Sequence, residues 1–154
     1  MKVINSFRGE YRFLSNFHPC SFEYEGLVYP NSEAAYHAAK CPDREERLKY
    51  TLIKNPVRAK QMGRREPLPA DWMERSCEVM ESILRAKFAV PELAECLKAT
   101  GDAYLEEGNR WHDNFWGKCS CDACREKEGK NHLGRILMAI RAELNREVEM
   151  EEAV

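Results

Sequence analysis

The apolar residues of this chain recur at helical spacing in two long segments, and this periodicity constrains the fold more than any other feature. In the first segment, Asp71 starts a helix whose expected inner face carries Met73, Cys77, Met80, Leu84 and Phe88. In the second, which begins near Asn131, the expected inner face carries Leu133, Ile136, Leu137, Ile140 and Leu144. Shorter helices between prolines and glycines are expected over 33–40, 44–53, 56–63 and 91–101. The sequence therefore predicts a mainly α fold.

A small β element is expected only near the N-terminus. Phe22, Tyr24 and the pair 27–28 favour strand, and Glu25-Gly26 between them favours a turn, so we predict a β-hairpin. With 154 residues the chain has the length of one compact domain. We expect that domain to span 1–146, followed by an acidic, frayed tail over 147–154.

Composition excludes several classes of function. The chain has 24 basic and 26 acidic residues, a formal net charge of −2, so no global positive field attracts nucleic acid. No apolar run approaches the roughly 18 residues that a membrane helix needs. The N-terminal residues become polar too early for a signal peptide. We therefore expect a soluble cytoplasmic protein that does not contact membranes.

The segment 33–40 carries the first candidate chemistry. Glu33 and Lys40 are seven residues apart, so a helix places them on one face about 10 Å apart along its axis, with Tyr36 and His37 between them. A surface helix with solvated ends is the simpler interpretation. The alanines and tyrosine favour a packed helix instead, and burial would lower the pKa of the lysine towards that of a nucleophilic amine.

Two further segments carry polar residues beside aromatic or glycine residues. Trp111 and Trp116 flank Asp113, which predicts either a stacking surface beside an acid or base, or two core tryptophans with a capping aspartate. The spacing leaves both open. Asn131, between glycines at 129 and 134, starts a helix whose amides can hold phosphate, although an ordinary cap is the simpler interpretation.

Seven cysteines are present, and we expect them to be reduced. Cys77 and Cys96 fall on apolar helix faces and are expected in the core. Three more lie close together, Cys119, Cys121 and Cys124, with His112 and His132 nearby. The spacing lacks a second CxxC pair, so reduced thiols in a loop, and no cofactor, are the favoured interpretation. The alternative is a zinc site formed by Cys119, Cys121, Cys124 and His132.

Four blocks of residues, in order over about 4–146, resemble the NADAR, or YbiA-like, family. They are Phe7-Arg8-Gly9 with Phe13-Leu14-Ser15-Asn16-Phe17; Tyr29-Pro30-Asn31-Ser32-Glu33 leading to Ala38-Ala39-Lys40; 111–117; and 129–141. The stretch between Gly117 and Gly129, with its cysteines, lies outside the shortest form of this pattern. Each block alone is weak, and the ordered set is specific.

The resemblance implies a mostly helical single domain with N-glycosidase activity on ribosylamines. The associated substrates are phosphoribosylamino-pyrimidine intermediates of riboflavin synthesis and ADP-ribose attached to the exocyclic amine of guanine, in nucleotides or in modified DNA. By position, the implied catalytic residues are Glu33, Lys40 and Asp113. The implied substrate-binding residues are Arg8, Asn16, Trp111, Trp116 and Asn131. We expect a monomer.

The residues themselves suggest a mechanism. A neutral Lys40 could attack the sugar carbon of a ring-opened N-riboside and release the base by transimination, with Glu33 or Asp113 moving protons. Direct attack by water on an oxocarbenium-like state is the alternative. Two other classes remain open at this stage: a module that binds ADP-ribose or nucleotides without turnover, and a small zinc-dependent interaction domain.

Overall fold

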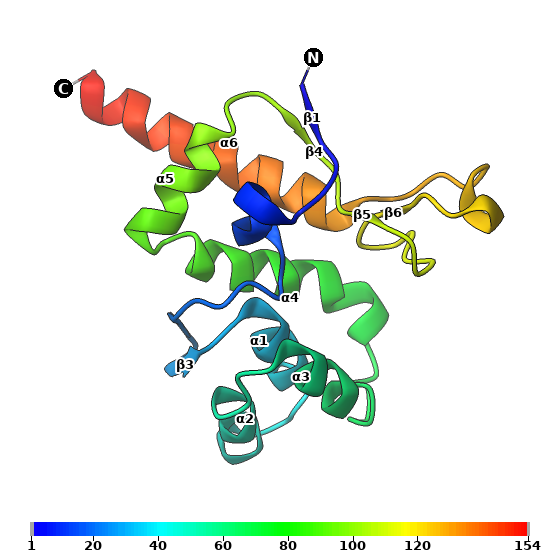
Figure 1. The fold of residues 1–154 in the computed structure, drawn as a ribbon. Helices are drawn as coiled ribbons and strands as arrows, with labels where there is room; N and C mark the ends of the chain where they lie inside the picture. Colours follow the sequence, from blue (N-terminus) through cyan, green and yellow to red (C-terminus); the bar gives the residue numbers. More distant parts are fainter. Residues whose placement is uncertain (1, 154) are drawn as a thin grey trace. The chain divides into compact units, whose positions relative to one another are not determined.

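The computed structural model describes residues 2–153, which group into two compact units. One unit comprises residues 2–15 and 91–153, and the other comprises residues 16–90. Helices dominate both units, as the element order and Figure 1 show, so the predicted mainly α fold is confirmed. The end residues of the predicted domain and tail, Met1 and Val154, lie outside the described part of the chain.

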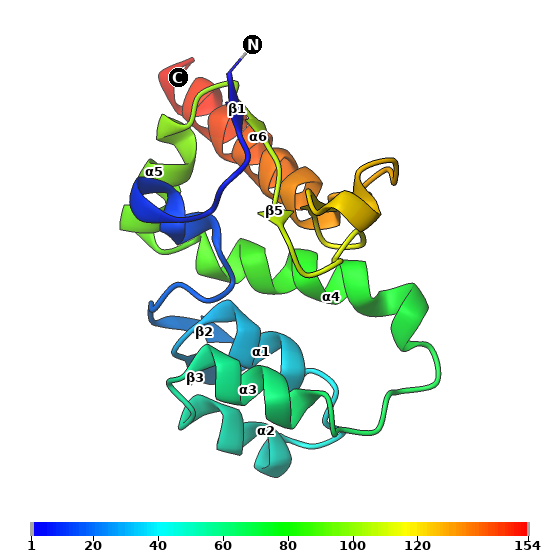
Figure 2. The ribbon, with the colours of Figure 1, turned by 45° about the vertical axis from the view of Figure 1, so that its right-hand side comes forward.

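The unit formed by residues 16–90 surrounds a short helix. Its elements are β2 (Phe22–Tyr24), β3 (Leu27–Tyr29), α1 (Ser32–Ala38), α2 (Arg44–Thr51), α3 (Pro56–Gly63) and α4 (Trp72–Lys87). Helix α1 contacts α2, α3 and α4, and the hairpin β2–β3 contacts α2 and α4 (Figure 2). Side chains on α1 are therefore held from several directions.

Local sequence explains where α1 begins and how closely it packs. The Asn31 side chain accepts a hydrogen bond from the Ala34 N–H at 2.8 Å, which caps the helix. Ala34, Ala35 and Ala38 are completely buried, because small side chains let neighbouring helices approach. The helix ends at Ala38, two residues earlier than predicted, and Lys40 lies in the turn that follows.

The predicted hairpin is confirmed. Strand β2 pairs with β3 in antiparallel register, with Tyr24 opposite Leu27. Glu25 and Gly26 both have positive φ, 49° and 83°, as the tight turns of two-residue hairpins require.

Of the inner face predicted for helix α4, Met80, Leu84 and Phe88 are buried, whereas two positions are not. Met73 is 74% exposed and Cys77 is only half-buried, so their assignment to the inner face was wrong. The buried residues are Trp72, Ser76, Met80, Ile83, Leu84 and Lys87. Trp72 packs its ring 5.3 Å from that of Tyr36, and burying this large side chain outweighs burying Met73. Asp71 makes no side-chain cap and instead pairs with Arg75 at 2.8 Å.

The other unit combines two helices with short parallel strand pairs. Its elements are β1 (Val3–Ile4), η1 (Gly9–Leu14), α5 (Pro91–Ala99), β4 (Tyr104–Leu105), β5 (Gly108–Asn109), β6 (Lys118–Cys119), η2 (Asp122–Cys124) and α6 (His132–Glu152). Strand β1 pairs with β4, and β5 with β6, both in parallel. Helix α6 contacts α5 and β4 and buries Leu133, Leu137 and Ile140.

Two details at the helix surfaces differ from expectation. Cys96 is exposed on α5, so its assignment to the core was wrong; Leu93 and Leu97 occupy the buried face instead. Residues 147–152 of the segment expected as a frayed tail belong to α6, which continues through Glu152. Among the described helices, none combines the length and apolar character needed to cross a bilayer.

Candidate active site

Three polar side chains form a hydrogen-bonded row along α1 and the turn after it. Glu33 Oε1 lies 2.8 Å from His37 Nε2, and His37 Nδ1 lies 3.0 Å from Lys40 Nζ. The spacings of four and three residues place these side chains on one helix face. All three are largely buried: the Glu33 side chain is 12% exposed, that of His37 6%, and Lys40 9%. We call this row the Glu33–His37–Lys40 array.

The two contacts of the His37 ring determine which tautomer a neutral imidazole would adopt in the array. A neutral imidazole with its hydrogen on Nε2 donates to the Glu33 carboxylate and accepts from Lys40 at Nδ1. Lys40 also donates to the Gly63 carbonyl oxygen at 3.2 Å. An uncharged amine has two hydrogens, which these two acceptors occupy, so its lone pair remains for attack on an electrophile.

Burial of Lys40 favours this uncharged form. Burial lowers the pKa of Lys40 from its ordinary value of 10.5, while the nearby carboxylates of Glu33 and Glu66 act to raise it. The amine also lies 5.7 Å from the ring centre of Tyr36 and 6.0 Å from that of Trp72, and both rings attract its charged form. Desolvation is one way in which enzymes activate a lysine as a nucleophile.

Gly63 shapes the space beside the array. A Cβ atom added at Gly63 would lie 2.0 Å from His37 Nδ1, a distance at which two atoms cannot coexist. The last turn of α3 therefore comes against the imidazole because this residue has no side chain. Gly63 thus holds His37 by contact and Lys40 by a hydrogen bond.

A cavity of about 670 Å³ adjoins the array. Lys40 forms part of its wall, together with Cys41, Glu66 and Arg75. Glu66 accepts hydrogen bonds from the Tyr50 hydroxyl at 2.9 Å and Lys49 at 2.6 Å. This volume lies within the range of small-molecule sites, and its wall carries the basic side chains of Arg47, Lys49 and Arg75 beside the carboxylates of Glu46 and Glu66.

Asn16 is the other predicted site residue in this unit. Its main-chain oxygen accepts from the Glu33 N–H at 3.1 Å, and its side-chain oxygen accepts from the Ser32 hydroxyl at 2.9 Å. Asn16 therefore anchors the first turn of α1, directly beside the residue that begins the array.

Further predicted site residues lie in the unit formed by residues 2–15 and 91–153, and none of them belongs to the array. Asp113 Oδ1 accepts from the N–H groups of Phe115 at 3.1 Å and Trp116 at 2.8 Å, which is the capping role weighed as an alternative. Trp111 is 52% exposed, whereas the half-buried Trp116 packs edge-on against Phe115. Arg8 is exposed and immediately precedes η1.

Asn131 uses its side-chain amide inside the protein. Its oxygen accepts from the Glu107 N–H at 3.0 Å, and its nitrogen donates to the Leu105 carbonyl at 2.8 Å and the Tyr104 hydroxyl at 3.3 Å. It is 1% exposed and makes no side-chain cap of α6. Both donors and one acceptor position are thus occupied, which is the environment of a structural residue.

Two features of the array were not predicted from the sequence. The spacing placed His37 between Glu33 and Lys40 but did not show that it joins them, although residues at i, i+4 and i+7 are the pattern that could reveal it. The contact with Gly63 comes from another helix and leaves no local signal.

The histidine assigned to the cysteine cluster was wrong. Among the described residues, His112 lies with Cys119, Cys121 and Cys124, their potential ligand atoms all within 4.8 Å of one another. His132 instead packs its ring 4.6 Å from that of Phe115 and 6.4 Å from that of Trp116. Its position at the start of α6 directs it towards these aromatic rings.

The fold and the array describe a mainly helical protein with a buried lysine in a polar network, and the comparisons define its class. Residues 5–145 match the family model of the NADAR domain. The chain therefore belongs to the NADAR family, as the sequence blocks predicted. The match includes the segments that carry the array and the cysteine cluster.

Relatives of known name are similar over most of the chain. N-glycosidase YbiA of Escherichia coli is 36% identical over 88% of this chain and 82% of its own length. A riboflavin biosynthesis protein of Vibrio vulnificus is 38% identical over 86% of this chain, but the chain covers only 35% of that protein. The NMR structure of E. coli YbiA matches with a TM-score of 0.79 and 32% identity, covering 96% of this chain and 88% of the other.

Proposed function

We propose that this protein is an N-glycosidase that cleaves the bond between ribose and an exocyclic amine of a base, and that Lys40 is its nucleophile. The observation that carries the proposal is the buried Lys40 amine at the end of the Glu33–His37–Lys40 array, held by His37 and Gly63. The name N-glycosidase, borne by relatives in Escherichia coli and Nostoc punctiforme, supports the reaction class.

Two substrates fit this reaction. Relatives in Vibrio vulnificus and maize are named riboflavin biosynthesis proteins, which supports a phosphoribosylamino-pyrimidine. The second substrate is guanine that carries ADP-ribose on its exocyclic amine, free or in DNA. Both present the same ribose carbon, bonded to an exocyclic nitrogen, and both carry phosphate. The Arg47, Lys49 and Arg75 side chains on the cavity wall suit that phosphate.

The chemistry proceeds through a Schiff base. The ribose ring opens as its C1–O4 bond breaks: O4 keeps the bonding electron pair and takes a proton, and the lone pair of the exocyclic nitrogen forms an iminium with C1. The lone pair of Lys40 adds to C1, and the exocyclic nitrogen takes a proton and departs as the free amine of the base. The sugar remains bonded to Lys40 as an imine. Water then adds to this carbon and releases the sugar aldehyde and the lysine amine.

Glu33 and His37 supply the proton transfers. When Lys40 adds to C1, its nitrogen loses a proton, and His37 Nδ1 at 3.0 Å is in position to accept it. The proton on Nε2 can pass to Glu33 at 2.8 Å, and the reverse movement protonates the leaving amine. We assign the acid role to Glu33 because Asp113 already accepts two backbone hydrogen bonds. Stacking of the base on Trp111 or Trp116 stays a prediction.

Borohydride trapping tests the proposal directly. The protein is incubated separately with a ribosylamino-pyrimidine phosphate and with an ADP-ribosylated guanosine oligonucleotide, and base release is followed by chromatography. Borohydride reduces a sugar–lysine imine to a stable amine, and peptide mass spectrometry should place the added sugar on Lys40. Lys40→Met should abolish both turnover and adduct, whereas Lys54→Met, a change to an exposed lysine of the same unit, should preserve both.

The alternative results are distinct. If the base is released without an adduct, and Lys40→Met still releases it, the reaction proceeds by direct attack of water and not through Lys40. Tight binding of either compound without release of a base would identify a non-catalytic nucleotide-binding module instead.

A further inference from the structure

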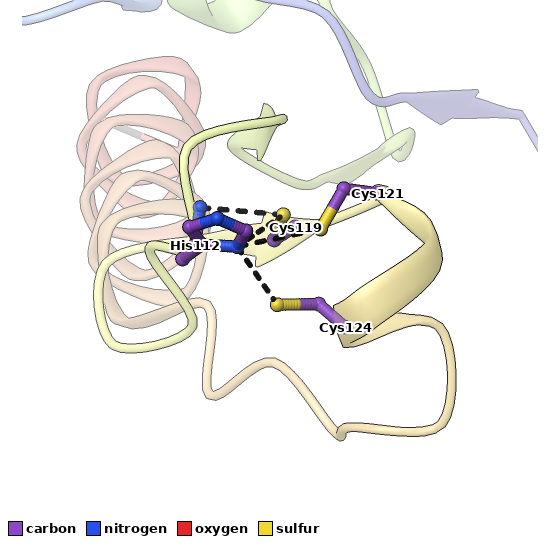
Figure 3. Close-up of side chains that lie close together, drawn as sticks. All are labelled: His112, Cys119, Cys121 and Cys124. Atoms are coloured by element: carbon purple, nitrogen blue, oxygen red, sulfur yellow. Dashed lines mark hydrogen bonds between the residues drawn. The ribbon is translucent and has the colours of Figure 1, made fainter.

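One histidine and three cysteines converge in the loop between β5 and α6 (Figure 3). His112 precedes β6, Cys119 lies in β6, Cys121 follows it, and Cys124 ends η2. His112 Nδ1 lies 3.3 Å from the sulfur of Cys121, 3.4 Å from that of Cys124 and 4.0 Å from that of Cys119. Cys119 and Cys124 are buried, at 0% and 1% exposure. We call these four residues the His–Cys cluster.

Hydrogen bonds of the His112 ring alone do not explain why three sulfur atoms surround one ring nitrogen. One imidazole nitrogen either donates one hydrogen or accepts through one lone pair, so Nδ1 can satisfy one of the three sulfur atoms around it. A cation at the centre satisfies all four groups at once, because it accepts the nitrogen lone pair and the three thiolates together.

The distances also match a tetrahedral zinc site. Zinc binds thiolate sulfur at about 2.3 Å and histidine nitrogen at about 2.0–2.1 Å, so a tetrahedral angle separates nitrogen from sulfur by about 3.6 Å. The observed nitrogen–sulfur distances of 3.3, 3.4 and 4.0 Å lie on either side of that value. Three thiolates and one imidazole form a soft donor set that favours zinc over magnesium or calcium.

The backbone around the His–Cys cluster supports an anionic thiolate site. The His112 N–H donates to the Cys119 sulfur at 3.3 Å, and His112 itself adopts a left-handed conformation with φ of 69°. Such a φ is uncommon for histidine and turns its ring towards the thiols. Lys118 donates to the Cys124 carbonyl at 3.1 Å and to that of Lys127. The positive charge of Lys118 would partly compensate the net charge of −1 that zinc and three thiolates carry together.

We propose that His112, Cys119, Cys121 and Cys124 form a structural zinc site. Four protein ligands close the coordination sphere, so the metal would stabilise the loop rather than bind substrate. The site would tie residue 112 to β6 and η2, and therefore set the conformation of the segment that carries Trp111 and Asp113.

Metal analysis of the full chain tests the proposal. The protein is purified without a histidine tag under reducing conditions and reconstituted with zinc. Gel filtration removes unbound metal, and inductively coupled plasma mass spectrometry measures the zinc that remains. One zinc per chain is expected. Replacement by Co²⁺ should produce a thiolate-to-cobalt charge-transfer band and the visible spectrum of a tetrahedral ion.

Matched variants identify the ligands. Cys121→Ser and His112→Asn should weaken zinc affinity by more than about 100-fold, because loss of an outer-shell partner alone costs about 10–100-fold. Asparagine also tolerates positive φ, so the His112 variant keeps its backbone conformation. Cys96→Ser and His132→Asn should bind zinc as the unmodified chain does. Far-UV circular dichroism checks that each variant retains its helices.

Several results would overturn the proposal. One is a reconstituted chain without zinc. Another is unchanged affinity in both ligand variants. A third is loss of zinc in His132→Asn with retention in His112→Asn. A disulfide within the cluster in freshly reduced protein, detected as a mass lower by two hydrogens, would do so as well. If a ligand variant fails to fold, the cobalt spectrum of the unmodified chain still decides the outcome.

Discussion

The Glu33–His37–Lys40 array and the His–Cys cluster both gather polar side chains around one imidazole, but they are built differently. The array lies along one face of α1 and the turn after it, where regular backbone spacing sets its 2.8 and 3.0 Å contacts. The cluster lies in a loop, where its histidine needs a left-handed backbone and its cysteines come from a strand, a connection and a 3₁₀ turn.

Because the two regions are built differently, they should respond differently to substitution. A helix holds its side chains through backbone hydrogen bonds, so single substitutions in the array should alter chemistry more than structure. A loop with little regular structure depends on its own cross-links, so the cluster should respond to loss of metal. The predictions below separate the two regions, in order of decreasing effect on turnover.

The largest effect is expected from Lys40→Met. Loss of the nucleophile should lower kcat by at least about 10³-fold. The free energy of unfolding should change by no more than about 1–3 kcal/mol, because removal of a buried amine offsets the loss of its hydrogen bonds to His37 and Gly63. Initial rates and urea denaturation measure the two quantities. Zinc content should stay unchanged, and a loss of zinc would mean that the two regions are not separable as described.

Glu33→Gln should lower kcat by about 10²-fold through loss of the proton acceptor at the end of the array. It should also change the pH profile. The rate rises with pH as Lys40 loses its proton, and the Glu33 carboxylate raises the pKa of Lys40. Removing that charge should move the rising limb to lower pH. A limb that stays in place, or moves to higher pH, would contradict the assignment of Lys40.

Gly63→Ala should lower kcat by about tenfold and destabilise the fold by about 1–3 kcal/mol, the usual cost of overpacking. The added methyl group would occupy the position of the His37 ring and force it away from Lys40. Rates and thermal denaturation measure both effects. Unchanged turnover with a lower Tm would show that His37 does not act in the reaction.

Lys87→Met should leave turnover unchanged, because this lysine is buried but does not belong to the Glu33–His37–Lys40 array. Lys87 is 0% exposed, and burial lowers its pKa from 10.5 to about 8. Below pH 8 the folded state carries the Lys87 charge in its interior, which lowers the free energy of unfolding. This loss of stability disappears as pH rises from 8 towards 10.5, because Lys87 loses its proton in the folded state before it does so in the unfolded state.

The unmodified chain should therefore gain stability over that pH range relative to Lys87→Met. At pH 7 the variant should be more stable by up to about 3 kcal/mol. Urea denaturation at pH 7 and pH 10 measures the difference. A variant that is less stable at both values would show that the contacts of this lysine, which include its position 5.1 Å from the Phe88 ring centre, outweigh the cost of burying its charge.

Much of the candidate site followed from local spacing. Glu33 and Lys40 were placed on one face by their separation of seven residues. The role of His37 depended on the orientation of its ring, which Gly63 of a different helix controls. For the cluster, the spacing of three cysteines in six residues favoured reduced thiols and gave zinc only as the alternative, and the histidines at 112 and 132 lie at nearly the same distance from them in sequence.

Sequence alone determined the helical periods, the turn at Glu25-Gly26 and the family, because these depend on neighbouring residues and on ordered blocks of residues. Tertiary structure decided which histidine faces the thiols and which face of α4 is buried. It also decided that Lys40 is enclosed. These outcomes depend on contacts between residues distant in the chain, where the burial of a large ring such as Trp72 outweighs local preference.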